Sequence, residues 1–228
     1  MRDLYVRSSA AITMVWSMVA CAATTPSPQA AEVSVVALPS PHTTGGIGLD
    51  DALTNRRSIR DFGERRITDE ELSQLLWAAQ GITAAWGGRT APSAGALYPI
   101  ELYVATPDGL LHYVPDGHRV ERLSDVDVRA RLASAAGDQS AVADAPVVMV
   151  IAGVIGRTEV KYGDRAERYV FLEAGHVCQN ILLEATSLGL GAVPVGAFSD
   201  DDVRGILGLS SDATPVYLVP VGPPAPAS

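Results

Sequence analysis

Residues 146–152 (PVVMVIA) are apolar at every position, and this run limits the possible folds more than any other segment of the chain. A strand that is apolar on both of its faces belongs in the middle of a sheet whose two faces are both covered. We therefore expect this strand at the centre of a sheet, with helices packed on either side.

The rest of the sheet is expected from strands separated by tight turns. Asp108-Gly109 and Asp116-Gly117 are turn signals, since glycine tolerates the positive φ that such turns require. Apolar and polar side chains alternate around these turns, as in half-buried strands. The pattern predicts a mostly antiparallel sheet with the additional strands 100–104, 110–114, 119–123 and 215–221.

Helices are expected between these strands. Thr68 and Glu71 have the spacing of a capping box, and leucines follow them at helical intervals. Short helices are expected near 48–53 and 199–208, and the longest over 164–188. Strands and helices are mixed without regular β-α-β alternation, which indicates an α+β fold.

Charge and cysteine content exclude several classes of function. The 228 residues carry 17 Lys and Arg against 26 Asp and Glu, so the chain has an acidic excess. A nucleic-acid binder needs a basic stripe that neutralises phosphates, so no nucleic-acid partner is expected. Two cysteines cannot form a disulfide framework or a four-ligand zinc site, and the four histidines are scattered along the chain. We expect no metal site.

The first residues have the pattern of a signal peptide. Arg2 and Arg7 precede an apolar run over residues 10–23, and small residues follow near a cleavage point. The sequence therefore predicts a signal peptide over residues 1–21 and an exported protein.

The end of this segment is similar to a bacterial lipoprotein box. Residues 18–21 (MVAC) place Cys21 where such a cysteine becomes the lipidated first residue, which would anchor the chain to a membrane. The alternatives are plain cleavage near Ala30, or a misassigned start that leaves the protein cytoplasmic. Residues 22–46 are rich in Ala, Thr, Pro and Ser and are expected to form a flexible linker.

An arginine cluster is the first candidate binding site: Arg56, Arg57 and Arg60 with the hydroxyl of Ser58 among them. Guanidinium groups match phosphate oxygens with paired hydrogen bonds. On its own the cluster is more simply explained as a solvated charged turn with surface ion pairs. The sequence has no glycine-rich phosphate loop, no His-Glu-x-x-His and no Gly-x-Ser-x-Gly, so hydrolase and metalloenzyme functions lack their parts.

Two loops of small residues would let the backbone approach a flat ligand closely. Each is also explained by a tight connection or by a glycine bulge in a buried strand. The first loop contains Pro92, Ser93, Ala94 and Gly95, and the second contains Val195, Gly196 and Ala197.

Together and in this order, these segments resemble the nitroreductase family of flavin mononucleotide (FMN) enzymes, from residue 51 to residue 222. TAPSAGALYP at 90–99 is similar to the SagB-type branch, whose best-understood members oxidise thiazolines and oxazolines in peptides to azoles. KYGDR at 161–165, LEAGH at 172–176 and Gln179-Asn180 support the same assignment.

The resemblance implies a nitroreductase-like FMN-binding domain over residues 47–223, followed by a tail over 224–228. It implies a homodimer with FMN at the subunit interface. The arginine cluster would hold the phosphate and ribityl chain, and residues 92–95 of the partner would line the isoalloxazine. Residues 195–197 would place backbone donors near flavin N5, where they stabilise the charge of reduced flavin.

Lys161 and Tyr162 match the Lys-Tyr pair to which azoline-oxidising members assign acid–base work. Making an azoline aromatic removes a proton from carbon, so the lysine would act as a base and the tyrosine would relay or donate a proton. The alternative is an exposed lysine beside a tyrosine that packs in an interface.

Two features depart from the family pattern. Residues 219–228 carry no charge, whereas many members have a basic residue there at the phosphate, so Arg89 or another arginine would have to replace it. An exported chain would also lack NAD(P)H.

The resemblance implies an FMN-dependent oxidoreductase acting on a small heterocyclic, peptidic or aromatic substrate. The alternatives are an NAD(P)H-dependent nitro or quinone reductase and an exported flavin-binding protein without turnover.

Overall fold

A seven-stranded sheet forms the centre of the computed structural model, which describes residues 34–226. The strands are β1 Ser34–Ala37, β2 Ile100–Thr106, β3 Gly109–Val114, β4 Arg119–Ser124, β5 Val147–Val154, β6 Gly191–Ala192 and β7 Ala213–Gly222. They lie in the order β1-β4-β3-β2-β5-β7-β6, and every neighbouring pair is antiparallel. The expected antiparallel α+β fold is confirmed.

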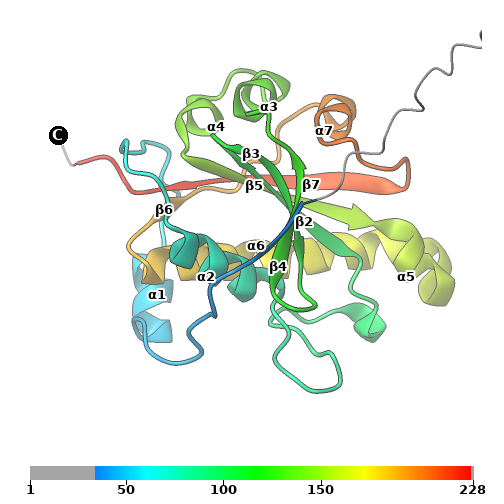
Figure 1. Ribbon diagram of the computed structural model, residues 1–228. Coiled ribbons are helices and arrows are strands. Elements are labelled where there is room, and N and C mark those ends of the chain that lie inside the picture. The colour runs from blue at the N-terminus through cyan, green and yellow to red at the C-terminus, as the bar shows by residue number, and fades with distance from the viewer. Residues whose placement is uncertain (1–33, 227–228) are drawn as a thin grey trace, which may run out of the picture. The chain divides into compact units, whose positions relative to one another are not determined.

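Helices cover both faces of this sheet (Figure 1). They are α1 Leu49–Asn55, α2 Asp69–Gln80, α3 Arg129–Ala135, α4 Ser140–Asp144, α5 Ile155–Tyr162, α6 Ala166–Ser187 and α7 Asp200–Leu207, with single 3-10 turns at Ala94–Ala96 and Gly163–Arg165. Helices α2 and α6 pack on one face, and α3, α4 and α7 pack on the other. None of the helices within residues 34–226 has the length and hydrophobicity of a membrane span.

The central strand β5 is buried on both faces, as its apolar sequence predicts. Val148 and Val150 contact the core beneath α3, α4 and α7, whereas Met149 and Ile151 contact the core beneath α2 and α6. All four side chains are fully buried. Successive side chains of a strand point to opposite faces, so only an uninterrupted apolar run can serve both cores.

The expected capping box begins α2. The hydroxyl of Thr68 accepts a hydrogen bond from the backbone N–H of Glu71 at 3.2 Å, and the Glu71 carboxylate accepts one from the N–H of Thr68 at 2.9 Å. These bonds satisfy two donors that the first helical turn would otherwise leave free.

The folded part is larger at both ends than the sequence predicts. Strand β1 lies within the expected linker 22–46 and pairs with β4, because Val35 and Val36 favour a strand despite the Pro- and Ser-rich surroundings. Within the expected tail, Pro224 forms a bridge with Phe62, and the N–H of Ala225 donates to the Asp61 carbonyl. Residues 1–33, which include the expected signal peptide and Cys21, lie outside the described residues.

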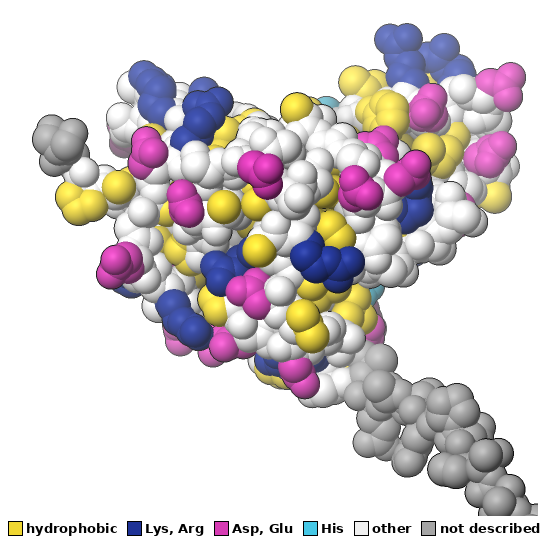
Figure 2. Space-filling model, turned by 90° about the horizontal axis from the view of Figure 1, so that it is seen from above, with side chains coloured by type: hydrophobic (Ala, Val, Ile, Leu, Met, Phe, Trp, Pro, Cys, Tyr) yellow, Lys and Arg dark blue, Asp and Glu magenta, His cyan; other side chains and the backbone are white. Residues whose placement is uncertain are grey.

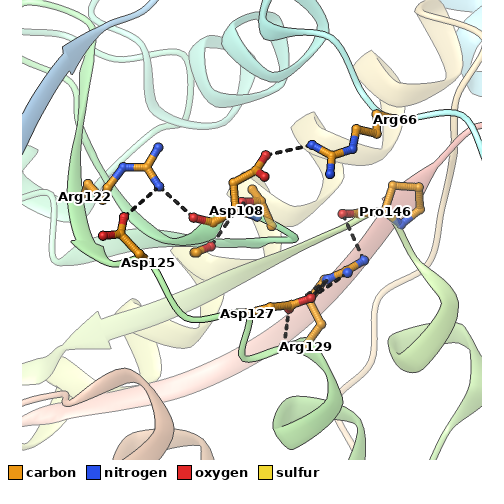
Figure 3. A network of polar contacts seen from close by, with 9 residues as sticks. Arg66, Asp108, Arg122, Asp125, Asp127, Arg129 and Pro146 are labelled. Atoms are coloured by element: carbon orange, nitrogen blue, oxygen red, sulfur yellow. Dashed lines mark hydrogen bonds and ion pairs between the residues drawn. The ribbon is translucent and has the colours of Figure 1, made fainter.

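Charged side chains hold the turn between β2 and β3 (Figure 3). Arg66 donates to the Asp108 carboxylate at 2.8 Å, and Arg122 donates to the Asp108 carbonyl at 2.7 Å. A Cβ at Gly109, where φ is +130°, would lie 2.0 Å from the carbonyl oxygen of Ser124. The turn therefore requires glycine at this position.

Candidate functional site

Helix α5 is an element that the sequence did not predict, and it carries the Lys-Tyr pair at its C-terminal end. It follows β5 directly and has no side-chain cap, so its start lacks a local sequence signal. Because of α5, Lys161 and Tyr162 reach Gly95 in the 3-10 turn Ala94–Ala96. A Cβ built at Gly95 would lie 2.9 Å from Lys161 Nζ and 3.0 Å from Tyr162 Oη. Three of the expected site residues therefore meet within one chain.

The loop over residues 92–98, here called the 92–98 loop, has an unusual backbone. Gly95, Ala96 and Tyr98 have φ of +65°, +54° and +46°. Such angles are costly for residues with a Cβ and persist only where surrounding contacts hold them. One such contact is the hydrogen bond from the Tyr98 N–H to the Ser93 hydroxyl at 2.9 Å.

A cluster of three polar side chains, Glu173, Gln80 and Arg89, lies next to this loop. Glu173 of α6 is only 2% exposed, and Gln80 at the end of α2 is 1% exposed. The Arg89 guanidinium donates to Gln80 Oε1 at 2.9 Å and stacks 4.4 Å from the centre of the Tyr98 ring. Burial raises the pKa of Glu173 to about 7, and the nearby Ser93, Arg89 and Gln80 offset part of this rise.

Two atoms of this group are left without hydrogen bonds. Within residues 34–226, Gln80 Nε2 and Glu173 Oε1 form no hydrogen bond of acceptable geometry. Neither Glu173 nor Gln80 is among the site residues expected from the sequence, although Glu173 lies within the LEAGH segment at 172–176. The sequence does contain a pattern that indicates a buried acid, because Glu173 stands at a core-facing position of α6 between Val170 and Val177. An acid at such a position is rarely buried without a specific partner.

The arginine cluster lies at the end of α1. Arg57, Ser58 and Arg60 are exposed and Arg56 is half-buried. Seven other arginines form ion pairs with acids, but within the described residues no member of the cluster does. Arg57 donates to the carbonyls of Thr54 and Arg56, both at 2.8 Å. Three positive charges therefore share one exposed segment of an acidic chain without neutralisation.

The second small-residue loop begins beside this cluster. Ser58 forms a parallel bridge with Ala192, and the N–H of Ile59 donates to the Ala192 carbonyl at 3.1 Å. Val195 is buried and its N–H donates to Leu218 at 2.8 Å. Gly196 and Ala197 are exposed, and their N–H groups donate to nothing within the described part of the chain.

These residues form two groups at opposite ends of α6 (Figure 1). The arginine cluster follows α1, and the segment before α1 contacts the C-terminal end of α6 through Ile47 and Ser187. The Lys-Tyr pair precedes the N-terminal end of α6. The 22 residues of α6 span roughly 33 Å at 1.5 Å per residue. A single chain therefore does not bring its two groups to one place.

The residues present fit FMN. Unpaired guanidiniums and a serine hydroxyl suit a phosphate, which accepts several charge-assisted hydrogen bonds. The free N–H groups of Gly196 and Ala197 suit the polar edge of a flat ring. Arg89 does not join the arginine cluster of its own chain, because it bonds Gln80 and stacks on Tyr98.

Other chemistry has less support. Residues 34–226 contain no group of three His, Cys, Asp or Glu side chains arranged to hold a metal ion. Cys178 is buried, and burial raises the pKa of its thiol to about 12, so it is unsuited to nucleophilic work. On the face shown in Figure 2, basic and acidic side chains are interspersed, and the described part of that face has no continuous basic stripe.

Comparisons with known proteins agree with this geometry. The sequence profile described as the Nitroreductase family matches residues 53–223. A candidate nitroreductase of Methanocaldococcus jannaschii (MJ1384) is 47% identical over 182 residues, which cover 77% of this chain and 91% of that protein. A candidate NADH dehydrogenase/NAD(P)H nitroreductase of Methanothermobacter thermautotrophicus is 25% identical over 179 residues, covering 77% and 76% of the two chains.

Solved structures show the same fold. The crystal structure of a candidate nitroreductase from Ralstonia eutropha superposes with a TM-score of 0.78 at 34% identity, covering 85% of this chain and 90% of that chain.

Proposed function

The chain belongs to the nitroreductase family, and on that basis we propose that it is an FMN-dependent oxidoreductase of SagB type acting on a small heterocyclic, peptidic or aromatic substrate. Members of this family generally use flavin cofactors. When bound, FMN supplies the hydride chemistry, whereas the protein binds, orients and tunes it.

The arginine cluster carries the proposal. Within the described residues Arg56, Arg57 and Arg60 have no acidic partner, although the chain has an excess of acids. Exposed like charges repel each other, so an anion held among them is stabilised. The neighbouring Gly196 and Ala197 would then hold the ring of the same cofactor.

The position of the second group supports the proposal of a homodimer. Residues 92–95 and the Lys-Tyr pair lie at the other end of α6 from the arginine cluster. They would reach the same FMN only from a second copy of the chain. Each of two sites would therefore use the arginine cluster of one protomer and the 92–98 loop of its partner.

Lys161 and Tyr162 are the proposed acid–base residues. Lys161 is the only lysine of the sequence, in which all other basic residues are arginines. An arginine stays protonated in proteins, whereas a lysine can lose its proton and act as a base. Lys161 is exposed in the single chain, so the partner chain and the substrate would have to exclude solvent from its amine.

The first experiment is cofactor binding. The purified full chain should be yellow or should take up added FMN, and it should elute as a dimer. Arg60→Ala should weaken FMN binding roughly tenfold or more, the usual effect of one charge-assisted hydrogen bond. Arg131→Ala removes another exposed arginine and is the matched control. A colourless monomer that takes up no FMN would refute the proposal.

The second experiment tests the Lys-Tyr pair with azoline peptides. Lys161→Arg keeps the charge but removes the base, so it should abolish turnover while FMN binding remains. Tyr162→Phe should lower turnover without changing FMN binding. Normal turnover in both variants would remove the assigned roles.

An NAD(P)H-dependent nitro or quinone reductase is the second candidate, because the Methanothermobacter thermautotrophicus relative carries the name of such an enzyme. Anaerobic mixing of the FMN-loaded chain with NADH or NADPH distinguishes the two. Rapid bleaching by the nicotinamide favours the reductase, and bleaching only by an azoline favours the dehydrogenase. Bleaching by neither indicates a flavin-binding protein without turnover.

We also propose export, with Cys21 as a lipid anchor. Fractionation of cells that carry a C-terminally tagged chain tests this proposal, with Cys21→Ser as the control for lipidation. Recovery of the unprocessed chain in the cytoplasm would contradict it.

A further inference from the structure

Helix α5 has few apolar contacts to fix its place in the fold. Among its eight residues Thr158 alone is buried, and Ile155 is partly buried against the core beneath α2 and α6. No side chain caps its first turn. A surface helix is normally held by burial of an apolar face, so polar contacts have unusual weight in placing α5.

Arg157 of α5 makes two such contacts. Its guanidinium donates a hydrogen bond to the Tyr98 carbonyl at 3.3 Å and forms an ion pair with the Glu101 carboxylate. Tyr98 ends the 92–98 loop, and Glu101 belongs to β2, the strand that follows this loop. A planar guanidinium can donate in two directions at once. One side chain therefore joins α5 both to the loop and to the sheet.

The Glu101 carboxylate is itself held by a second partner. Its Oε1 pairs with Arg157, and its Oε2 shares a hydrogen bond of 2.6 Å with Nε2 of His112 on β3. The side chain of Glu101 is only 16% exposed. Burial alone would raise its pKa, but the hydrogen bond of His112 and the charge of Arg157 keep the pKa below its ordinary value. Arg157 therefore has an ionised partner whose position is fixed by the sheet.

The Tyr98 backbone needs contacts of this kind. Its φ of +46° is costly for a residue with a Cβ and persists only where surrounding groups hold it. The Tyr98 N–H donates to the Ser93 hydroxyl at 2.9 Å, which is a contact inside the loop. The hydrogen bond that Arg157 donates to the Tyr98 carbonyl is the one that links this backbone to α5.

Arg157 and Lys161 lie on the same side of α5, because side chains four residues apart on a helix are neighbours. Arg157 bonds the loop at Tyr98, and the Lys161 amine would lie 2.9 Å from a Cβ built at Gly95. Helix α5 therefore meets the loop at two points one turn apart. The hydrogen bond at the first point limits how far the amine at the second can move from Gly95.

We propose that Arg157 is a positioning residue of the acid–base pair: anchored by Glu101, it holds α5 against the 92–98 loop and so keeps the Lys161 amine beside Gly95. This inference rests on the proposed function, in which Lys161 is the base. Arg157 itself touches neither the cofactor nor the reacting atoms in this role.

The first experiment follows the position of Lys161 without using activity. Lys161 is the only lysine of the sequence, so a lysine-labelled full chain gives one set of side-chain NMR signals. A nuclear Overhauser effect reports only short distances between protons, and the wild type should show one between Lys161 and Gly95. Arg157→Ala should lose it. The Arg157 side chain is 45% exposed, so this replacement leaves the core intact.

Arg129→Ala is the matched control. Arg129 of α3 also pairs with an acid, Asp127 at 2.7 Å, and donates to a backbone carbonyl, that of Ala145 at 2.9 Å. It lies on the opposite face of the sheet from α6 (Figure 1). Its removal costs the protein the same kinds of contact, but the signal between Lys161 and Gly95 should remain.

The second experiment measures turnover of azoline peptides at saturating FMN. Arg157→Ala should lower kcat by roughly 10- to 100-fold, the usual cost of misplacing a reacting group by a fraction of a turn, with a smaller change in KM. Arg157→Lys keeps a charged donor without the planar fork and should recover part of this loss. Arg129→Ala should keep the kcat of the wild type.

A double mutant tests the part played by Glu101. Glu101→Ala removes the anchor of Arg157 and should lower kcat in the same direction. If the two residues act as one unit, the double variant should have a kcat no lower than that of the weaker single variant. Effects that multiply in the double variant would overturn the anchoring by Glu101.

The remaining outcomes are distinct. A signal between Lys161 and Gly95 that persists in Arg157→Ala overturns the inference even if turnover falls, and so does its loss in Arg129→Ala as well. Loss of the signal with an unchanged kcat also overturns the positioning role. A wild-type chain that binds no FMN refutes the proposed function, and the NMR signal still decides whether Arg157 holds Lys161 at the loop.

Discussion

Replacing Glu173 by Gln should make the protein more stable at alkaline pH and leave it unchanged at acidic pH. Burial raises the pKa of this carboxyl from an ordinary 4.5 to about 7 in the folded state. The folded protein therefore holds a proton that the unfolded chain releases between these two values. Stability from this group is fully present below pH 4.5 and is lost as the pH rises to about 7.

The pKa difference sets the size of the effect. At about 1.4 kcal/mol per pH unit, ionising Glu173 in the folded state costs about 3 kcal/mol. A glutamine of the same shape has no such cost. The difference in free energy of unfolding between Glu173→Gln and the wild type should grow from about 1 kcal/mol at pH 5 to about 3 kcal/mol at pH 8.

Urea unfolding at a series of pH values measures this difference, because the contributions of all other groups cancel between the two proteins. Glu167→Gln, an exposed position on the same helix, is the matched control and should stay within about 1 kcal/mol of the wild type at every pH. If the difference in free energy of unfolding from the wild type does not change between pH 5 and pH 8 for either variant, the conclusion that Glu173 is buried and protonated is refuted.

Three further predictions follow from the glycines and the buried thiol. Gly109→Ala should destabilise the protein by about 3 kcal/mol, because its Cβ would overlap the Ser124 carbonyl at 2.0 Å, whereas Gly205→Ala, a helical position with free space, should be neutral or stabilising in the same thermal assay. Gly95→Ala should displace the Lys161 amine and lower kcat/KM by about 100-fold, measured at saturating FMN because Gly95 also belongs to the proposed cofactor site; unchanged turnover would show that this contact is not used. In a chain with Cys21→Ser, Cys178 should react with a thiol reagent at pH 8 only after unfolding, and rapid labelling of the folded protein would contradict its burial.

Features that depend on a few adjacent residues could be predicted from the sequence. The apolar run of β5 and the capping box at Thr68 each have a local physical cause, and both are confirmed. Strand β1 and helix α5 lack such a cause. The four residues of β1 are stabilised by pairing with β4, and α5 begins without a capping side chain.

The residues of the candidate site also differ in whether the sequence could predict them. The arginine cluster could be recognised because its members are contiguous. The meeting of Gly95 with Lys161 depends on β5 and α5 placing two distant segments side by side, which no local pattern encodes. Glu173 shows the limit most clearly, since its helical periodicity indicates burial but only the packing of α2 and the 92–98 loop shows what it touches.

The separation of the two residue groups along α6 has a genetic consequence. In the proposed homodimer, a protomer that carries Arg60→Ala contributes a damaged arginine cluster to one site and an intact Lys-Tyr pair to the other. A protomer that carries Lys161→Arg does the reverse. If the proposed dimer forms and the two variant proteins are mixed at an FMN concentration too low to load Arg60→Ala, the mixed dimer combines both lesions in one site and leaves the other intact, so each mutant allele should complement the other.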